Sequence, residues 1–157
     1  MDEDIRRKIL TLLDQHRIMT IATLRPDGWP QATTVGYANE GLTIYFLCGP
    51  DSQKARNLAR DNRVSLTIDH DTPQVMEITG LSMAAHAQAV VDSTEAAKAL
   101  GLLMLKYPQQ LHTIADAESK GCPHIPRDPD GDLRARLLQG IRPHRSRHLL
   151  GRFPRSW

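Results

Sequence analysis

Three apolar runs separated by two short turn sequences make up residues 17–48, RIMTIATLRPDGWPQATTVGYANEGLTIYFLC. Isoleucine, valine, threonine and aromatic residues favour extended strands, whereas the RPDG and NEG segments carry the Pro, Asp, Asn and Gly residues that favour tight turns. Turns this short join antiparallel neighbours, because a parallel pair needs a crossover connection of about a dozen residues or more. The segment therefore predicts a three-stranded antiparallel meander with strands at 17–24, 29–38 and 42–48.

The remainder of the chain adds helical and extended patterns around this meander. Acidic residues followed by apolar residues at helical spacing predict an amphipathic helix over 2–16. The further elements expected are a short helix over 51–61 capped by Asp51, a strand over 63–69, one long strand bent at Gly80 or two strands over 74–92, a helix over 93–108, a candidate second helix over 109–120 and a loop over 121–132. Antiparallel strands in this number predict a mainly β, α+β fold, namely a six-stranded barrel with peripheral helices.

The size and composition of the chain restrict its class. A chain of 157 residues is long enough for one domain with a sizeable core and too short for two. Its first residues, MDED, are acidic rather than basic, and it has no apolar run of the about eighteen residues that suggest a membrane span. Two cysteines, Cys48 and Cys122, are too few for a disulfide framework. These features predict a cytoplasmic protein with no membrane association.

Charge is distributed unevenly along the chain. Residues 1–132 carry thirteen Lys and Arg against all eighteen Asp and Glu, whereas residues 133–157 carry seven Arg and no acid. Three interpretations of the basic segment stay open: a divergent strand over 133–141 with a solvated end, a shifted reading frame near the 3′ end of the gene, or an anion-binding tail. Nucleic acid is not the expected partner, because the chain has few aromatic groups that could stack on bases.

The stretch CGPDSQKARNL, residues 48–58, joins the third predicted strand to the short helix. The first N–H groups of a helix lack intrahelical acceptors, and together with the positive end of the helix dipole they favour phosphate. Ser52 adds a hydroxyl at this position, and Lys54 adds a flexible ammonium group. The alternative interpretation is that Asp51 or Ser52 only caps the helix, while Lys54 and Arg56 face solvent.

Several short motifs in a fixed order favour the phosphate interpretation: Gly28-Trp29-Pro30, Ile44-Tyr45-Phe46-Leu47, Ser52-Gln53-Lys54, Asn57-Leu58 and Arg63-Val64-Ser65-Leu66. With the following MEITGLSMAAHAQAVVDSTEAAKAL, residues 76–100, they resemble the flavin-binding split barrels of the pyridoxamine 5'-phosphate oxidase-like family, and its general stress protein members in particular. The resemblance implies that residues 1–132 form an FMN-binding split-barrel domain. Residues 133–157 form an Arg-rich strand or tail that lies off the family pattern.

The resemblance also implies a cofactor site and an oligomeric state. Ser52 and Lys54 would hold the phosphate of FMN, and the ring and ribityl chain would be lined by Thr33, Thr34, Val35, Phe46, Leu47 and Cys48. The flavin of this family lies at a dimer interface, so the resemblance implies a homodimer. The expected function is an FMN-dependent oxidoreductase that acts on a small molecule whose identity the sequence does not reveal.

Two departures from the family pattern argue against oxidation of pyridoxamine 5'-phosphate itself. The strand ATTVGYA, residues 32–38, has no cation, and the Arg-Leu-x-Pro-like substrate motif is absent from the end of the chain. The alternatives are a deazaflavin-dependent reductase of the same fold and a non-catalytic protein that binds flavin or haem. We predict no metal site, because His112, Cys122 and His124 have irregular spacing. We assign no catalytic residue, because flavin chemistry often needs only positioning.

Overall fold

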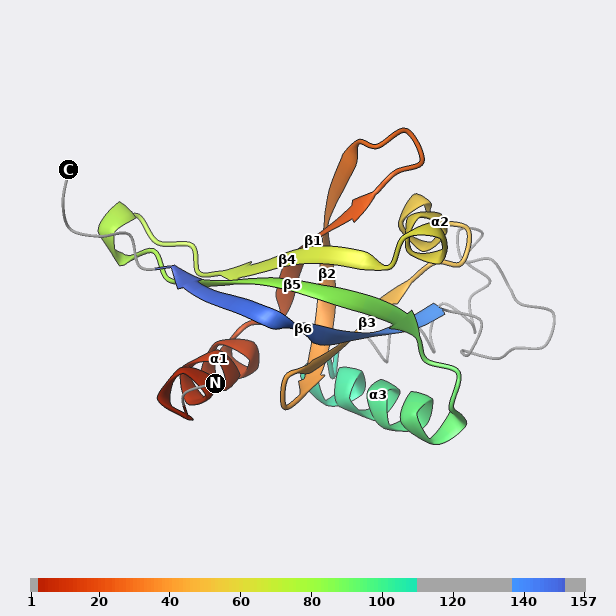
Figure 1. The fold of residues 1–157 in the computed structure, drawn as a ribbon. Coiled ribbons are helices and arrows are strands. Elements are labelled where there is room, and N and C mark those ends of the chain that lie inside the picture. Colours follow the sequence, from red (N-terminus) through yellow and green to blue (C-terminus); the bar gives the residue numbers. More distant parts are fainter. Residues whose placement is uncertain (1–2, 110–136, 152–157) are drawn as a thin grey trace.

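The computed structural model of the chain describes residues 3–109 and, for the backbone alone, residues 137–151. Six strands and three α-helices make up this part of the chain (Figure 1). In chain order they are α1 (Glu3–Gln15), β1 (Ile18–Leu24), β2 (Pro30–Glu40), β3 (Thr43–Cys48), α2 (Gln53–Arg60), β4 (Arg63–Asp69), a short 3₁₀-helix (Val75–Glu77), β5 (Gly80–Ala89), α3 (Ser93–Lys106) and β6 (Leu137–Gly151).

The strands form one closed barrel in the order β1-β2-β3-β6-β5-β4, and every neighbouring pair is antiparallel. Tight turns join β1 to β2 and β2 to β3, with Gly28 at a φ of 86° and Gly41 at a φ of 58°. Glycine adopts these positive angles without the steric cost that other residues carry. The meander predicted for residues 17–48 and the six-stranded α+β barrel are both confirmed.

The sixth strand comes from the Arg-rich end of the chain. β6 lies between β3 and β5, where its backbone pairs residue 141 with Ile44 on one side and with Ala87 on the other. It extends well beyond the strand expected over 133–141. The division of the chain into a domain of residues 1–132 and a tail of residues 133–157 stays a prediction.

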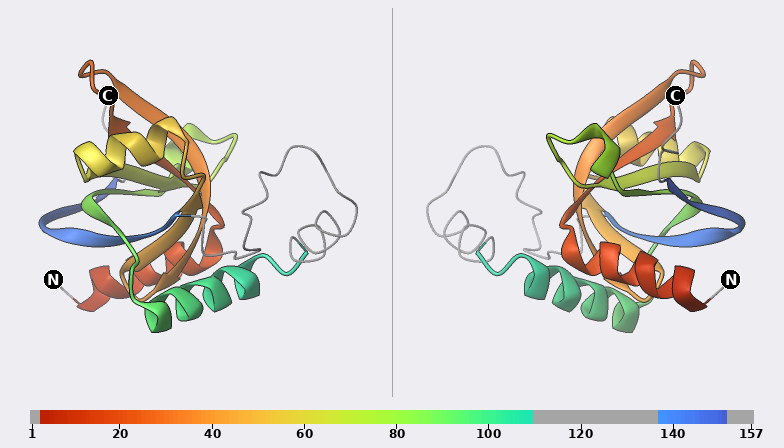
Figure 2. Two further views of the ribbon diagram at one scale, coloured as in Figure 1. Left: turned by 90° about the vertical axis from the view of Figure 1, so that its right-hand side faces the viewer. Right: turned by 90° about the vertical axis from the view of Figure 1, so that its left-hand side faces the viewer.

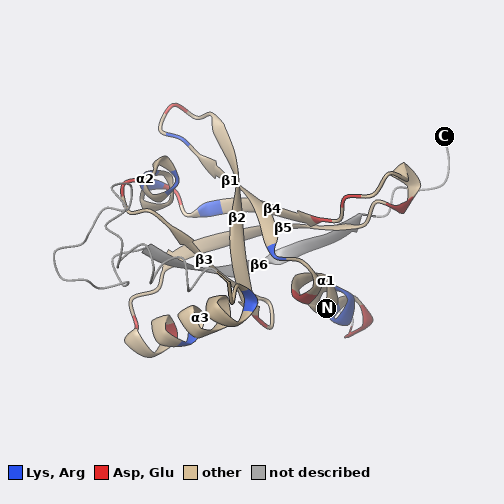
Figure 3. Cartoon of the chain, turned by 180° about the vertical axis from the view of Figure 1, so that it is seen from behind, with Lys and Arg blue, Asp and Glu red and all other residues tan. Residues whose placement is uncertain are grey.

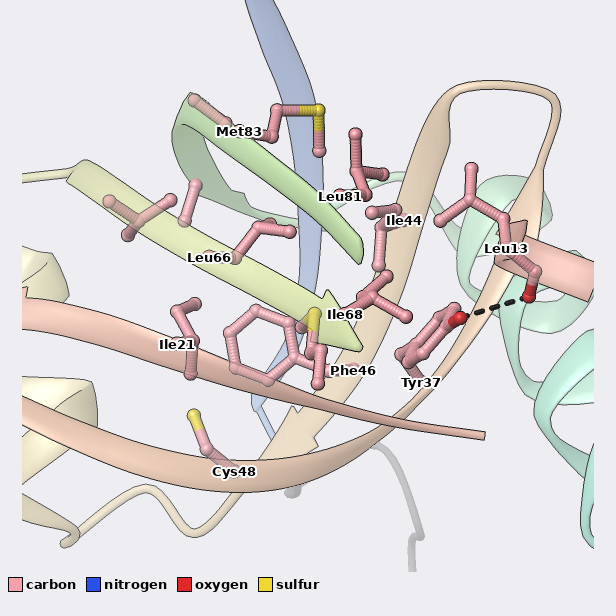
Figure 4. Packing of buried hydrophobic residues seen from close by; sticks show 14 of the residues in the cluster. Leu13, Ile21, Tyr37, Ile44, Phe46, Cys48, Leu66, Ile68, Leu81 and Met83 are labelled. Atoms are coloured by element: carbon pink, nitrogen blue, oxygen red, sulfur yellow. Dashed lines mark hydrogen bonds between the residues drawn. The ribbon is translucent and has the colours of Figure 1, made fainter. Parts of the chain in front are cut away.

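Alternating side chains fill the interior of the barrel. In β4, Val64, Leu66 and Ile68 are buried, whereas the residues between them are exposed. This is the two-residue period of a strand with one face toward the core. Figure 4 shows Phe46 in the centre of this core, and Tyr37 at the end of it that faces α1. The core residues therefore come from every described strand from β1 to β5 and from α1 and α2.

The three α-helices lie outside the barrel. Figure 2 shows α1 and α3 together on one side, and α2 on the other side next to the β1–β2 hairpin. The buried Tyr37 hydroxyl donates a hydrogen bond to the Leu13 carbonyl at 2.9 Å, which ties α1 to β2. A second apolar cluster fixes α3 through Ala99 and Leu103, which pack with Ala38 and Tyr45 on the outer face of β2 and β3.

The barrel closes through all six strands, but it has an opening along one edge of β2 where this strand lacks its β3 neighbour. Residues 30–36 pair with β1 alone, and β2 pairs with β3 only from Tyr37 to Glu40. On the N-terminal side of Tyr37, β2 and β3 are not paired, and this gap is the split of a split barrel. The chain leaves β3 at Cys48 and enters α2 beside this opening. Gln31 in this half of β2 accepts a hydrogen bond from Asn57 of α2 at 3.1 Å, so the opening lies next to α2.

Two expected elements differ from the structure. A strand was expected from residue 74, but Val75–Glu77 is a 3₁₀-helix and β5 begins at Gly80. Val75 and Met76 are 68% and 52% exposed, so these apolar side chains have no core face to hold them in a strand. The short helix begins at Gln53 instead of 51. The expectations for residues 110–132 lie outside the described residues.

Within the described ranges, none of the helices combines the length and apolar character that a membrane crossing requires.

Candidate cofactor site

The junction between β3 and α2 has the geometry of a capped helix start. Ser52 is the N-cap residue, and its Oγ accepts a hydrogen bond from the Ala55 N–H at 3.1 Å. The Arg56 N–H reaches the Ser52 carbonyl at 3.2 Å. The N–H groups of Gln53 and Lys54 have no acceptor inside the helix, as at any helix start. The capping role of Ser52 is therefore confirmed, and two backbone donors remain for another partner.

Lys54 differs from the other basic residues of α2. Its side chain is partly buried, and burial lowers the pKa of its ammonium group. It forms no ion pair with an acid among the described residues. In contrast, the exposed Arg56 donates to the Asp51 carbonyl at 2.6 Å and to Gln53 Oε1 at 3.0 Å. Lys54 is thus a partly buried cation without a protein counter-ion in the described structure, and such a group favours a bound anion.

Cys48 completes a cluster with Ser52 and Lys54. Cys48 is only 7% exposed, and this burial raises the pKa of its thiol, while Lys54 and the Ser52 hydroxyl act in the opposite direction. The side chains of all three residues are therefore neighbours. Figure 3 shows that basic residues on α2 and at the start of β4 lie on this side of the molecule.

The three predicted residues on β2 divide between the two faces of the strand. Thr33 and Val35 are partly buried, whereas Thr34 is exposed. Val35 packs against the main core. Oγ1 of Thr33 is buried and has no hydrogen-bond partner in the described structure. A buried hydroxyl without a partner is rare, and it often marks the place of a missing ligand or water.

The two remaining predicted residues also lie on opposite faces. Phe46 is fully buried in the main core, close to Ile21 and Leu66 in Figure 4. Leu47 is partly buried on the outer face of β3, where it packs against the cluster that holds α3. The structure thus brings Cys48, Ser52 and Lys54 together, and it sets Thr34 and Leu47 on outer faces of the barrel.

The sequence interpretation missed a buried polar residue beside this cluster. Asn57 is fully buried and donates to Thr23 Oγ1 at 2.9 Å and to Gln31 Oε1 at 3.1 Å. The buried positions of α2 are Ala55, Asn57 and Leu58, whereas Ala59 is exposed. The sequence feature that could have indicated a buried polar residue is an asparagine next to the apolar positions of a short helix.

Two surface grooves lie near α2 but do not include this cluster. One lies between the end of α2 and the adjoining ends of β4 and β5, and its walls include Arg60, Arg63 and His86. The other lies between the β1–β2 turn and the end of α2. Both are open to solvent. The chemistry of Ser52 and Lys54, rather than these grooves, therefore identifies the candidate site.

Comparison with known proteins identifies the family to which this barrel belongs. The profile of the family described as pyridoxamine 5'-phosphate oxidase matches residues 5–129. The chain belongs to the pyridoxamine 5'-phosphate oxidase family. The resemblance seen in the motifs of residues 28–100 is thereby confirmed.

One curated relative agrees with the predicted general stress protein subgroup. General stress protein 26 of Bacillus subtilis (strain 168) is 29% identical over 69 residues, which are 44% of this chain and 49% of that protein. The alignment thus spans about half of the length of this curated relative.

Solved structures share the fold of the pyridoxamine 5'-phosphate oxidase family with this chain. The conserved hypothetical protein Rv2991 of Mycobacterium tuberculosis has a TM-score of 0.71 and 24% identity, over 96% of this chain and 85% of that one. HutZ, the heme storage protein of Vibrio cholerae, has a TM-score of 0.64 and 16% identity, over 92% of each chain. An F420 reductase has a TM-score of 0.57 and 23% identity, over 85% of this chain and 91% of that one. At these identities the likeness establishes the fold alone.

Proposed function

We propose that the chain is a flavoprotein that binds FMN at the β3–α2 junction and acts as an oxidoreductase on a small molecule. The observation that carries this proposal is Lys54, a partly buried ammonium group without an acidic partner in the described structure, at the start of a helix. A phosphate group would supply the missing counter-ion and would accept hydrogen bonds from the free N–H groups of the first turn.

The residues at the opening fit such a cofactor. Ser52, Lys54 and the backbone N–H groups of α2 would hold the phosphate, and the unpartnered Thr33 hydroxyl would meet a polar atom of the cofactor. Val35 and Cys48 would form apolar walls, with Phe46 behind them in the core. Thr34 and Leu47 would contact the cofactor only from the outer faces of the barrel.

Bound FMN would supply the hydride-transfer chemistry, and the chain would supply binding and orientation. The lack of any cation in residues 32–38 leaves recognition of the phosphate to α2, which supports a substrate other than pyridoxamine 5'-phosphate. A substrate that carries its own phosphate, such as pyridoxamine 5'-phosphate, would need basic residues near β2 in addition to those that bind FMN.

A titration of the purified protein with FMN and with riboflavin tests this proposal. The absorbance spectrum and the quenching of flavin fluorescence report binding. We expect FMN to bind at least about tenfold more tightly than riboflavin, because a charge-assisted hydrogen bond contributes about 1.5–3 kcal/mol. Equal affinities would contradict the phosphate site. A Soret band on addition of haem, or selective binding of the deazaflavin F420, would instead favour one of the alternatives.

We propose further that the protein is a cytoplasmic homodimer. Ile18 and Trp29, both on the β1–β2 hairpin, are 59% and 71% exposed and offer apolar surface for a partner. Sedimentation velocity should give twice the chain mass of 17.6 kDa. A monomer over the micromolar range in the presence of FMN would contradict the dimer.

A further inference from the structure

A hydrogen-bonded chain of side chains connects α2 to the open part of β2. Arg56 Nη2 donates to Gln53 Oε1 at 3.0 Å, and Gln53 Nε2 donates to Asn57 Oδ1 at 2.9 Å. Asn57 Nδ2 then donates to Gln31 Oε1 at 3.1 Å and to Thr23 Oγ1 at 2.9 Å. We call this arrangement the amide chain. Because Asn57 is fully buried, its carboxamide has to be satisfied by these partners.

The donor and acceptor groups of these side chains fix the direction in which the hydrogen bonds of the amide chain run. A guanidinium group can only donate, so Gln53 turns its oxygen toward Arg56 and its NH₂ toward Asn57. Asn57 accepts from Gln53 and donates onward for the same reason. Rotating any one carboxamide by 180° would place two donors or two acceptors against each other. The amide chain therefore ends on Gln31 with its oxygen engaged and its NH₂ group presented.

Two polar groups at this end have no partner among the described residues. Gln31 Nε2 donates to no described acceptor, and Thr33, two residues further along the same face of β2, has the buried Oγ1 without a partner. Of these two groups the Thr33 hydroxyl is the buried one, and leaving a buried polar group unpaired costs about 1–3 kcal/mol. Both groups lie on the part of β2 that has no neighbour on the β3 side.

We propose that Gln31 and Thr33 bind an oxygen acceptor of the cofactor, and that Arg56, Gln53 and Asn57 are positioning residues that orient the Gln31 carboxamide. This inference rests on the proposed function. It adds two neutral hydrogen-bond donors to the site, beside the ammonium group of Lys54. The acceptor is a phosphate oxygen or a ring carbonyl, which share the same hydrogen-bond chemistry.

The variant Gln31→Glu tests the binding role of Gln31. It keeps the oxygen that accepts from Asn57 and replaces the NH₂ group with a second carboxylate oxygen. We expect the Kd for FMN to rise at least tenfold with an unchanged midpoint of urea unfolding. Gln88→Glu, at an exposed position of β5, adds the same charge elsewhere and should change the Kd less than twofold. An unchanged Kd in Gln31→Glu, or an equal loss in both variants, would overturn the proposal.

Riboflavin distinguishes the two possible acceptors. If Gln31→Glu weakens FMN and leaves the Kd for riboflavin unchanged, the acceptor is the phosphate. If it weakens both flavins equally, the acceptor belongs to the ring or the ribityl chain. Each of these results supports the proposed contact.

Substitutions of Arg56 test the positioning role. Arg56→Met should raise the Kd for FMN about threefold, and Arg56→Lys should restore it, because lysine also only donates. Arg60→Met removes a charge from the same helix outside the amide chain, and it should have no effect. In the Gln31→Glu background, Arg56→Met should cause no further rise in the Kd for FMN. An equal effect in both backgrounds would show a simple loss of charge and would overturn the positioning role.

The outcomes separate this inference from the proposed function. If the wild-type protein binds FMN and Gln31→Glu binds it equally well, only the inference fails. If the wild-type protein does not bind FMN, both fail.

Discussion

Tyr107 packs its hydroxyl against the backbone of Gly36, so closely that a Cβ at position 36 would lie 2.9 Å from the Tyr107 oxygen. The same hydroxyl donates to the Arg17 carbonyl and accepts the Tyr37 N–H at 3.0 Å. The residue after α3 is thus fixed to the end of the β1–β2 ladder. Position 36 has no room for a side chain in this arrangement.

Gly36→Ala should therefore destabilise the protein. A Cβ–O distance of 2.9 Å requires either Tyr107 or β2 to move, and overpacking of this kind costs about 1–3 kcal/mol. Urea unfolding followed by circular dichroism measures the loss. Gly101→Ala is the matched control, because a Cβ there meets nothing within 4 Å and alanine favours a helix over glycine by about 1 kcal/mol. A Gly36→Ala protein as stable as the wild type would show that Tyr107 is not held against β2.

Lys54→Met should weaken FMN binding by about 10- to 100-fold, the range expected for the loss of one charged hydrogen bond. Binding of riboflavin should not change, because it lacks the phosphate. Quenching of flavin fluorescence measures both constants. Arg60→Met provides the control for a lost charge on α2, and a similar loss in that variant would assign the effect to the general potential of the helix.

Thr33→Val should raise stability and lower cofactor affinity together. Valine has nearly the shape of threonine, and it removes a buried hydroxyl that has no partner in the described structure. We expect the free energy of unfolding without cofactor to rise by about 1 kcal/mol. The Kd for FMN should rise in the same variant. Thr67→Val, at an exposed site of β4, should change neither quantity. A rise in stability without a loss of affinity would remove Thr33 from the site.

The stability of the protein should rise with pH through Lys106. Its ammonium group donates to the Leu13 carbonyl at 2.7 Å and lies 4.0 Å from the centre of the Tyr37 ring. Burial lowers the pKa of Lys106 to about 8. Between this value and about 10.4 in the unfolded chain, the unfolded state binds more protons, so the free energy of unfolding increases with pH. Because Lys106 is partly exposed, we expect a gain of about 1 kcal/mol rather than the full value of the shift.

Urea unfolding of the wild type and of Lys106→Met at pH 7.5 and pH 9.5 checks this expectation. Cys48 acts in the opposite direction, because burial raises the pKa of its thiol and the unfolded chain loses that proton first. The difference between the two proteins therefore isolates Lys106. Equal pH dependence in both proteins would contradict the assignment.

The sequence predicted those parts of the fold that depend on local patterns. The turns at Gly28 and Gly41 follow from turn residues between apolar runs, and β4 follows from its alternation of buried and exposed residues. The sequence predicted Asp51 as the cap of α2, which is wrong, because Ser52 can cap a helix equally well. The structure decides for Ser52. The 3₁₀-helix at Val75–Glu77 was missed because apolar residues there have no core to face.

The site was predictable only where it is local in sequence. Cys48, Ser52 and Lys54 lie within seven residues, so one motif identifies all three. The partners of Asn57, in contrast, are Thr23 on β1 and Gln31 on β2, and only the folded barrel brings them to α2. Strand periodicity likewise separates Thr33 from Thr34, but it does not reveal that the Thr33 hydroxyl lacks a partner.

The place of β6 between β3 and β5 has a consequence for synthesis of the protein on the ribosome. Both neighbouring strands emerge long before residues 137–151, so each presents an unpaired edge to solvent while translation continues. Such edges invite pairing with other nascent chains, and barrels with distant pairings fold slowly. We expect the polypeptide to depend on chaperones until its final strand has left the exit tunnel, and a nonsense codon before position 137 to produce aggregates instead of a smaller folded domain.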